Sequence, residues 1–281
     1  MALKDMLVHL DASAESAARL ELAAALAARH GAHLVGLHAS EARMPAGLTA
    51  DAGGAALGLV MARLREEDAA EAAAARAGFE DRIRRDGLSG EWRVVRGRAV
   101  ENLAMQARHA DLTILGQPRP GREGARFAED LLEGALFASG RPVLMVPYAG
   151  HFGAVGARVL IGWNATREAA RAVADAMPFL TTAAEVVVLA INPSPGLEGH
   201  GEQPAADMAQ HLARHGVKAT AQQVLAHDVP EADVLLNCAA DLGADLIVMG
   251  AYGHSRLRQM VFGGVTRGIL ARMTVPVLLS H

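Results

Sequence analysis

Short apolar runs alternate with longer amphipathic segments along the whole chain. In the last third, runs such as EVVVLAI and DLIVMG are separated by segments in which apolar residues recur every three or four positions. A short, wholly apolar run predicts a strand that is buried on both faces, and the period of 3.6 residues predicts a helix. The pattern therefore predicts an α/β fold in which helices cover both faces of a parallel sheet.

The second half shows this alternation most clearly. Its predicted strands are RVLIGW, EVVVLAI, ATAQQVL, DLIVMG and PVLLS. The helices between them are expected near 166–177, 205–215, 230–243 and 264–273. Such a series suits a doubly wound, five-stranded domain with strand order 3-2-1-4-5. In that order a ligand crevice lies at the carboxyl ends of the first and fourth strands.

The chain also repeats itself. HADLTILG at 109–116 matches GADLIVMG at 243–250, and RPVLMVP at 141–147 matches VPVLLSH at 275–281, both with an offset of 134 residues. The starts of the halves match with an offset of 153, which sets Asp11 opposite Asn164. Self-similarity of this kind indicates a duplicated domain. The first half then carries about twenty extra residues in its middle.

Those extra residues and the junction of the halves can be interpreted from composition. ADAGGAALGLV is small and flexible, whereas REEDAAEAAAARAGFEDRIRRDG predicts a long Ala-rich helix. The Gly-rich stretch PYAGHFGAVGA at 147–157 is interpreted as a linker. We therefore expect two domains, 1–149 and 156–281.

Composition narrows the function classes. The net charge is −4 and aromatic residues are 4%, which argues against general nucleic-acid binding and base stacking. The single cysteine, Cys238, excludes an internal disulfide framework and is expected to be a small apolar residue of a helix. No apolar run approaches the ~18 residues of a membrane span. The N-terminus passes directly into a strand-like run, so we expect no signal peptide and a cytoplasmic protein.

The stretch GAYGHSRLRQMVFGGVTRGIL, from Gly250 to Leu270, is the main candidate for ligand chemistry. Glycines after a strand let backbone amides approach a small anion, and a helix N-terminus suits phosphate. The stretch is neither a Walker loop nor a dinucleotide fingerprint. The residues alone leave two interpretations open: phosphate binding, or a loop that needs glycine only for helix–strand packing.

Gly250-x2-Gly253-x9-Gly263 resembles the ATP-binding motif of the universal stress protein family, and the likeness extends over nearly all of the chain. The resemblance implies a tandem member with two adenine-nucleotide alpha-hydrolase-like domains. It also implies ATP, or ADP or AMP, as ligand, with Mg²⁺ accompanying ATP. Asn164 would lie near the adenosine, and the backbone of Ile191 would meet the base. The phosphates would be held by the amides and hydroxyl of a set of six residues: Gly250, Gly253, Gly263, Gly264, Val265 and Thr266.

The first half departs from this motif. Arg119, Glu129 and Asp130 stand where the second half has Gly253, Gly263 and Gly264. We expect Glu129 and Asp130 at the start of the last helix of this half, where they would satisfy the helix dipole and repel a triphosphate. The first half is therefore predicted to have lost nucleotide binding and to persist as a structural partner.

The resulting hypothesis is a nucleotide-binding protein of stress response or regulation. The alternative is a scaffold that acts by dimerisation alone; weak ATP hydrolysis is a third idea, without an identifiable general base. The resemblance implies pairing of the fifth strands, so the halves should form a pseudo-dimer through Val143–Val146 and Val277–Leu279, and two chains should pair again as a homodimer. No membrane or nucleic-acid partner is expected.

Histidines give weaker signals. His211 and His215 are spaced like a metal pair, but with no third ligand in sight they are interpreted as a solvated helix face. His9 and His38 end neighbouring predicted strands and could approach each other, either as a polar cluster in a vacated crevice or as a ligand site. Two aspartates before the predicted fourth strands are interpreted as turn residues on the opposite edge of the sheet: Asp111 and Asp245.

Overall fold

A computed structural model of the chain describes residues 2–41, 54–121, 124–153, 155–193, 203–226, 228–251 and 264–281. The first half contains β1 (Asp5–His9), α1 (Glu15–His30), β2 (His33–Ser40), α2 (Gly54–Asp86), β3 (Gly90–Arg96), α3 (Ala99–Ala107), β4 (Leu112–Gly116), α4 (Ala125–Ser139) and β5 (Val143–Val146). The second half contains β6 (Arg158–Gly162), α5 (Arg167–Leu180), β7 (Glu185–Ile191), α6 (Pro204–Arg214), β8 (Ala219–Val224), α7 (Glu231–Leu242), β9 (Leu246–Gly250), α8 (Gly264–Arg272) and β10 (Val277–Ser280).

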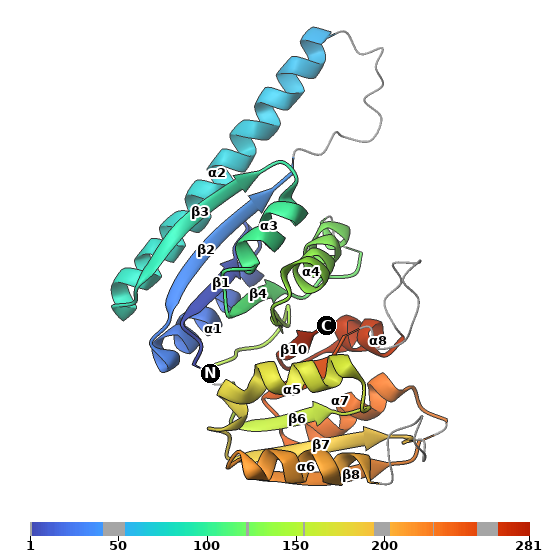
Figure 1. Cartoon of the computed structure of the whole chain (residues 1–281). Helices are drawn as coiled ribbons and strands as arrows, with labels where there is room; N and C mark the ends of the chain where they lie inside the picture. Colours follow the sequence, from blue (N-terminus) through green and yellow to red (C-terminus); the bar gives the residue numbers. More distant parts are fainter. Residues whose placement is uncertain are drawn as a thin grey trace.

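All ten of these strands belong to one continuous sheet (Figure 1). Their order is β3-β2-β1-β4-β5-β10-β9-β6-β7-β8, so each half has the predicted 3-2-1-4-5 arrangement of parallel strands. The halves join where β5 and β10 run antiparallel, with Val143 opposite Leu279 and Met145 opposite Val277. This pairing confirms the predicted pseudo-dimer contact, and it covers the two apolar edges that either half alone would expose.

Two helical layers sandwich the sheet. One core cluster unites α1, α2, α5 and α6 with one face, and the other unites α3, α4, α7 and α8 with the opposite face. Strands buried on both faces need the apolar composition seen in EVVVLAI, where only the first residue, Glu185, is charged and exposed and the five central residues are buried. In each half the first two helices lie on one face of the sheet and the last two on the other. This change of face accompanies the reversal of strand order that follows β3 in the first half and β8 in the second.

The two turn aspartates secure the amino-terminal edge of the sheet. Asp245 accepts backbone hydrogen bonds from Gly156, Ala157 and Arg158 at 2.7, 2.9 and 3.3 Å. Asp111 accepts from the amides of two residues that lead into β1, at 2.7 and 3.1 Å. These contacts confirm the turn interpretation, and they lie at the edge opposite to the carboxyl ends of the strands.

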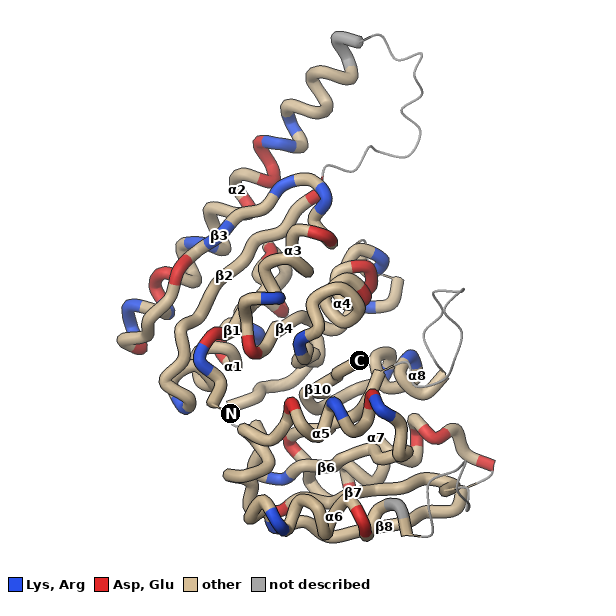
Figure 2. The backbone as a smooth tube through the Cα atoms, in the orientation of Figure 1, with Lys and Arg blue, Asp and Glu red and all other residues tan. Residues whose placement is uncertain are grey.

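Helix α2 corrects one expectation. The segment interpreted as flexible is helical from Gly54 onward, and α2 extends beyond the end of the sheet (Figure 1). The reason is that Leu57, Val60, Met61 and Leu64 continue the helical apolar spacing in front of the Ala-rich part. Charges of both signs follow along the helix (Figure 2), and pairs such as Arg63–Glu67 at 2.9 Å stabilise it locally.

Side chains also bridge the halves. The buried Gln117 donates through Nε2 to the Leu270 carbonyl at 2.7 Å, and its Oε1 accepts from the Tyr148 amide at 3.1 Å. Arg29 of α1 donates to the Val155 carbonyl and to the Thr182 hydroxyl, at 2.7 and 2.6 Å. The domain contact therefore combines strand pairing with a buried polar contact through Gln117 and a more exposed one through Arg29.

Candidate functional site

The predicted nucleotide site lies at the carboxyl edge of the sheet in the second half. Ile191 ends β7, Gly250 ends β9, and Asn164 follows β6 after a single intervening residue. From β6 the strand order runs outward to β7 and β8 on one side, and the chain returns to β9 on the other. This is the switch point at which open parallel sheets bind ligands. Two predicted residues, Gly253 and Gly263, lie outside the described residues.

Asn164 organises the turn in front of α5. Its Oδ1 accepts hydrogen bonds from the amide and the hydroxyl of Thr166, at 3.4 and 2.9 Å. Thr166 in turn caps α5 by accepting from the Ala169 amide at 3.3 Å. Asn164 is an exposed residue, but its side-chain oxygen Oδ1 already accepts the two hydrogen bonds from Thr166.

Gly250 has a packing reason to be glycine. A Cβ at this position would lie 2.5 Å from the Ala169 amide nitrogen and 2.6 Å from the Glu168 carbonyl carbon. The N-terminus of α5 therefore crosses the end of β9 too closely for any side chain. Gly250 is not among the described glycines with positive φ, so turn geometry does not demand it.

Helix α8 is another described element that starts at this edge of the sheet. It begins at Gly264 and precedes β10, so its N-terminus lies at the carboxyl edge of the parallel strands. Within the described helix no acidic residue occupies the first turn. Val265 is half-buried against the core, and Thr266 is only 4% exposed. The described first turn of α8 thus carries no carboxylate of its own that would compensate the positive end of the helix dipole.

The first half holds a cavity at the corresponding edge. Its volume is about 520 Å³, and it lies among the carboxyl ends of β1, β2 and β4 and the starts of α1 and α4. The wall combines apolar groups such as Phe127, Leu131 and Val146 with the two histidines singled out from the sequence, His9 and His38. The structure brings the histidines to neighbouring strands, since His9 pairs with Leu37 in the sheet register.

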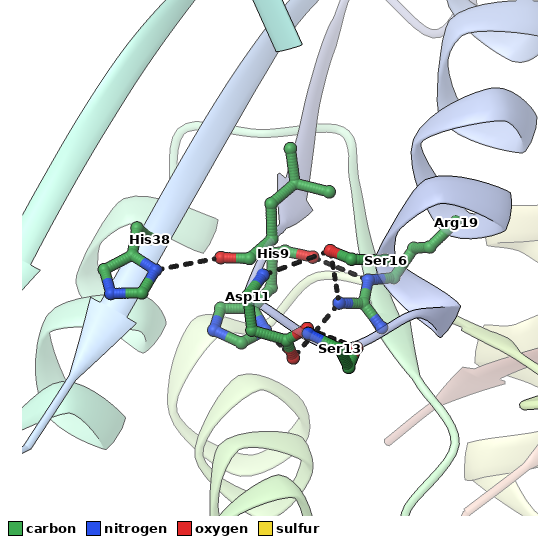
Figure 3. Close-up of polar contacts among 7 residues, drawn as sticks. His9, Asp11, Ser13, Ser16, Arg19 and His38 are labelled. Carbon is green, nitrogen blue, oxygen red and sulfur yellow. Dashed lines mark hydrogen bonds and ion pairs between the residues drawn. The ribbon is translucent and has the colours of Figure 1, made fainter. Parts of the chain in front are cut away.

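A buried cation stands beside this cavity (Figure 3). Arg19 of α1 is 3% exposed; its Nε donates to the His9 carbonyl at 2.6 Å, and its Nη2 contacts Ser16 Oγ and Asp11 Oδ2, both at 3.2 Å. Burial alone would raise the pKa of the Asp11 carboxyl, but the positive charge of Arg19, the neighbouring His9 and hydrogen bonds from Ser13 hold that pKa well below its usual range. Asp11 is therefore ionised and neutralises Arg19.

His9 is the least satisfied polar group of the cluster. It is 6% exposed, and its Nε2 has no hydrogen-bond partner among the described residues. Burial lowers the pKa of His9 from 6.5 to about 4; Asp11 opposes this shift, the charges of Arg19 and His38 reinforce it, and the Ala39 backbone opposes it weakly. The imidazole is consequently neutral near pH 7.

His38 connects the cluster to α2. Its Nδ1 lies 3.1 Å from the Leu10 carbonyl and its Nε2 lies 3.0 Å from Asp68 Oδ1. Both partners are acceptors, so both contacts are hydrogen bonds only when both ring nitrogens carry hydrogen. Burial would raise the pKa of Asp68, but hydrogen bonds from Ser40, Arg96 and His38 lower it to about 2.

Two residues of this cluster, Arg19 and Asp68, escaped the sequence analysis. For Arg19 a signal existed, because an arginine three residues after Ser16 and one residue before Leu20 falls on the buried face of α1. Asp68 gave no such signal, because charged residues are frequent along α2 (Figure 2).

The expectation for Glu129 and Asp130 was wrong. Helix α4 begins at Ala125, with Gly124 as its N-cap at φ 88°, and its described first turn holds no acidic residue. Glu129 and Asp130 therefore lie in the second turn of the helix. The reason is that RFAEDLLEGALF continues the apolar period of the helix toward its N-terminus, so that Phe127 also packs on the core.

The remaining candidate residues, His211 and His215, form no ligand site with other described side chains. His211 and His215 are exposed and contact each other edge to face with ring centroids 4.9 Å apart, at the end of α6. Among the described residues, no group of three or more His, Cys, Asp or Glu side chains could hold a metal ion. The described helices also include none that is long and apolar enough to cross a membrane.

Comparisons with known proteins agree with this architecture. The profile of the universal stress protein family matches residues 2–147 and again 157–281. The structure is similar to a crystal structure of a universal stress protein from Archaeoglobus fulgidus, with a TM-score of 0.76, 16% identity, and coverage of 98% of this chain and 96% of that one. A Pseudomonas aeruginosa structure bearing the same family name gives a TM-score of 0.61, 20% identity, and coverage of 99% and 93%.

At the sequence level, the chain is 33% identical to a universal stress protein of Synechocystis sp. over 67 residues. The match spans 24% of this chain and only 22% of that relative, so it covers a short shared segment. The family profile, in contrast, covers both halves almost completely. The chain therefore belongs to the universal stress protein family, as a tandem member with two copies of the domain.

Proposed function

We propose that the chain binds an adenine nucleotide in the second-half crevice and acts in stress response or its regulation. ATP is the proposed ligand, with ADP or AMP as close alternatives, and Mg²⁺ would accompany ATP. The support is chemical as well as topological. The crevice lies at the switch point between β6 and β9, and the family assignment favours a nucleotide there.

One observation carries the proposal: the start of α8 at that edge. Its described first turn is free of acidic residues, and Gly264 is exposed with no heavy atom within 4 Å of a Cβ placed on it. Backbone amides at a helix N-terminus bear about half a positive charge and favour phosphate. On the facing side, Asn164 is exposed at the end of β6 and would lie near the sugar.

The residues that would hold the nucleotide divide between these two sides. Asn164 and the backbone of Ile191 would meet the adenosine, and Gly264, Val265 and Thr266 would face the phosphates. Gly250 would shape the crevice chiefly by letting α5 approach β9. Gly253 and Gly263 remain proposed phosphate contacts that lie outside the described residues.

A scaffold function is the second candidate. The β5–β10 pairing joins two domains into one ten-stranded sheet, which is a continuous framework suited to presenting surfaces. Because β5 and β10 are already paired within the chain, a homodimer would have to use another surface. Sedimentation at several protein concentrations, with and without ATP, tests both the homodimer and its dependence on nucleotide.

Calorimetric titration of the full chain with ATP, ADP and AMP in the presence of Mg²⁺ tests the main proposal. Gly264→Asp places a carboxylate at the start of α8, where it favours the helix dipole but repels phosphate. ATP affinity should fall about tenfold or more, while thermal stability should stay equal or rise. Gly264→Asn is the matched control without charge and should retain binding.

Two results would contradict the proposal. Absence of saturable heat with all three nucleotides would leave the scaffold function. Equal ATP affinity of Gly264→Asp and the unaltered chain would place the phosphates away from α8. Phosphate release under the same conditions measures turnover, which we expect to be slow because no general base has been identified near α8.

A further inference from the structure

The ten-stranded sheet has two outer edges, β3 and β8, and their compositions differ (Figure 1). Strand β3 carries three charged residues, Glu91, Arg93 and Arg96, and helices α2 and α3 pack on it from opposite faces. Charges and covering elements keep an edge strand from pairing with another chain. Strand β8, with the sequence ATAQQV, has no charged residue and no proline. Its four central residues are exposed: Thr220, Ala221, Gln222 and Gln223.

The hydrogen bonds between β7 and β8 show which backbone groups of β8 remain open. The Val186 amide donates to the Lys218 carbonyl at 3.1 Å, and the Asn192 amide donates to the Val224 carbonyl at 2.9 Å. In a parallel ladder, alternate residues direct their N–H and C=O groups at the same neighbouring strand, so the even-numbered residues of β8 face β7. The backbone groups that point away from the sheet belong to the odd-numbered residues, among them Ala221 and Gln223.

Asn192 lengthens this open edge. Its backbone has a φ of 45°, its Nδ2 donates to the Ala226 carbonyl at 3.1 Å, and its Oδ1 accepts from the Ala226 amide at 2.8 Å. The side chain thus takes the place of a further residue of β7 and keeps the chain alongside the sheet after β8 ends. By the same alternation the backbone groups of Leu225 point outward, and this residue is 72% exposed. The open edge therefore ends on a large apolar side chain.

From these observations we infer that the chain forms a symmetric homodimer in which β8 pairs antiparallel with β8 of a second copy. Centring the pair on Gln223 sets this residue opposite itself and Ala221 opposite Leu225, so that the outward backbone groups of both strands meet and exchange hydrogen bonds. Two glutamine amides that face each other can each donate and accept, and the exposed leucine lies opposite a small residue.

Charge favours a second copy as the partner and favours this register. Centring on Gln223 also sets Lys218 opposite Asp228, and the symmetry creates this pair twice. Both residues are exposed, and neither takes part in an ion pair among the described residues. A shift of the centre to residue 222 or 224 would set Lys218 opposite Ala226 or Pro230, which are uncharged. The edge is thus complementary to itself in backbone, size and charge.

The chain already uses this mode of pairing between its halves. The equivalent strands β5 and β10 pair antiparallel, and the first two helices of both halves lie on the same face of the sheet. Pairing β8 with its copy repeats this symmetry, with α6 of both copies on one face and ten strands from each chain in a continuous sheet. The inference assigns a surface to the homodimer considered above; it rests on that part of the proposed function and not on nucleotide binding.

Sedimentation equilibrium of the full chain over a range of protein concentrations tests the inference with Gln223→Pro. Proline removes the outward N–H without removing a bond to β7, and edge strands tolerate it at such positions. The dissociation constant of the dimer should rise about thirtyfold or more, because the symmetry removes two backbone hydrogen bonds. Val94→Pro is the matched control at an outward position of β3 and should leave the dimer unchanged. Circular dichroism melting checks that both variants remain folded.

Gln223→Cys tests the register. In a hydrogen-bonded antiparallel pair the two Cα atoms lie about 5.5 Å apart, which is within reach of a disulfide. Mild oxidation should therefore link two chains of this variant. Ala221→Cys should stay unlinked, because its two copies would be about 13 Å apart along the strands. The unaltered chain, whose single cysteine is Cys238, gives the baseline.

A charge exchange tests the choice of partner. Lys218→Glu should weaken the dimer about tenfold, since two attractive pairs become repulsive, and Asp228→Lys should do the same. The double variant restores opposite charges and should recover most of the affinity. Effects of the single variants on folding alone would not be reversed in this way.

Three results would overturn the inference. These are a chain that sediments as a monomer at every concentration, a dimer that Gln223→Pro leaves equally tight, or cross-linking of Ala221→Cys at least as fast as that of Gln223→Cys. The proposed nucleotide site fails or stands separately: Gly264→Asp should still dimerise, and Gln223→Pro should still bind ATP.

Discussion

The variant Gly250→Ala tests whether this position needs glycine for helix–strand packing or for ligand binding. The new Cβ would lie 2.5 Å from the Ala169 nitrogen, 2.6 Å from the Glu168 carbonyl carbon and 3.0 Å from the Ala169 Cα. Carbon atoms in contact prefer about 3.5–4.0 Å, so α5 and β9 would have to separate by about 1 Å. The contacting atoms are backbone atoms of two buried residues of α5, so they cannot move away by a side-chain rotation.

The expected cost follows from this geometry. Overpacking a core typically costs about 1–3 kcal/mol, and a clash against backbone belongs in the upper half of that range. We therefore expect Gly250→Ala to lose about 2–3 kcal/mol of unfolding free energy and about 5–10 °C of melting temperature. Urea unfolding followed by circular dichroism, together with calorimetric melting, measures both quantities.

A control glycine comes from α2. Gly78 is exposed, and a Cβ built on it has no heavy atom within 4 Å, so Gly78→Ala should gain about 0.5–1 kcal/mol from helix propensity. If Gly250→Ala melts at the temperature of the unaltered chain but loses ATP binding, the packing argument is refuted. The glycine would then serve the ligand directly.

The other predictions concern electrostatics and the domain contact. The pKa of His9 is about 4 in the folded state and 6.5 when unfolded, so the unfolded chain binds the proton first as the pH falls. The contribution of neutral His9 to the unfolding free energy should be fully present above pH 6.5 and should fall by about 3 kcal/mol on acidification to pH 4. Urea midpoints measured across this range should show the decline, and His9→Phe should remove it. Asp245→Ala deletes the acceptor of three amides and should cost about 2 kcal/mol in urea unfolding, whereas Asp241→Ala, on an exposed residue, should stay within about 0.5 kcal/mol. Gln117→Leu leaves the Leu270 carbonyl and the Tyr148 amide unpaired and should cost about 1–3 kcal/mol; a melting profile identical to that of the unaltered chain would contradict its bridging role.

The regular part of the fold could be predicted because its signals are local. EVVVLAI, predicted as a strand, is β7 at Glu185–Ile191, and DLIVMG agrees with β9 to within one residue. The β5–β10 pairing was implied by the family resemblance, for two predicted strands whose apolar edges needed cover. The strand positions, in contrast, depend on composition within a few residues, which is what a sequence displays directly.

The parts that the sequence left open or placed wrongly depend on contacts between distant segments. For Gly250 the residues alone left phosphate binding and packing open, and the atoms that exclude its Cβ belong to α5. The alignment of the halves placed Glu129 at a helix start, but α4 begins at Ala125 because the apolar period in this half extends further. The cavity beside His9 was foreseen only as one of two possibilities, since the buried contacts of Arg19 cannot be read from its neighbours in sequence.

The two halves differ at one pair of positions in a way that explains both crevices. Arg19 in α1 corresponds to Ala172 in α5, by the same offset that sets Asp11 opposite Asn164. Where the helix carries arginine, the guanidinium lies over Gly116, and a carboxylate is needed to neutralise it. Where the helix carries alanine, its N-terminal backbone contacts Gly250 directly. No guanidinium then has to be neutralised, so the neutral side-chain amide of Asn164 can stand where the first half has Asp11.

The Arg19 side chain therefore carries a positive charge and also fills the space between α1 and the end of β4. At Gly116 the atoms nearest to a built Cβ all belong to the Arg19 side chain, whereas at Gly250 they belong to the helix backbone. The side chain holds α1 away from β4, and the cavity lies beside it, lined by both elements. The exchange of arginine for alanine, paired with that of Asp for Asn, thus gives the two copies of one fold a different contact between the first helix and the fourth strand, and a different charge beyond the end of the first strand.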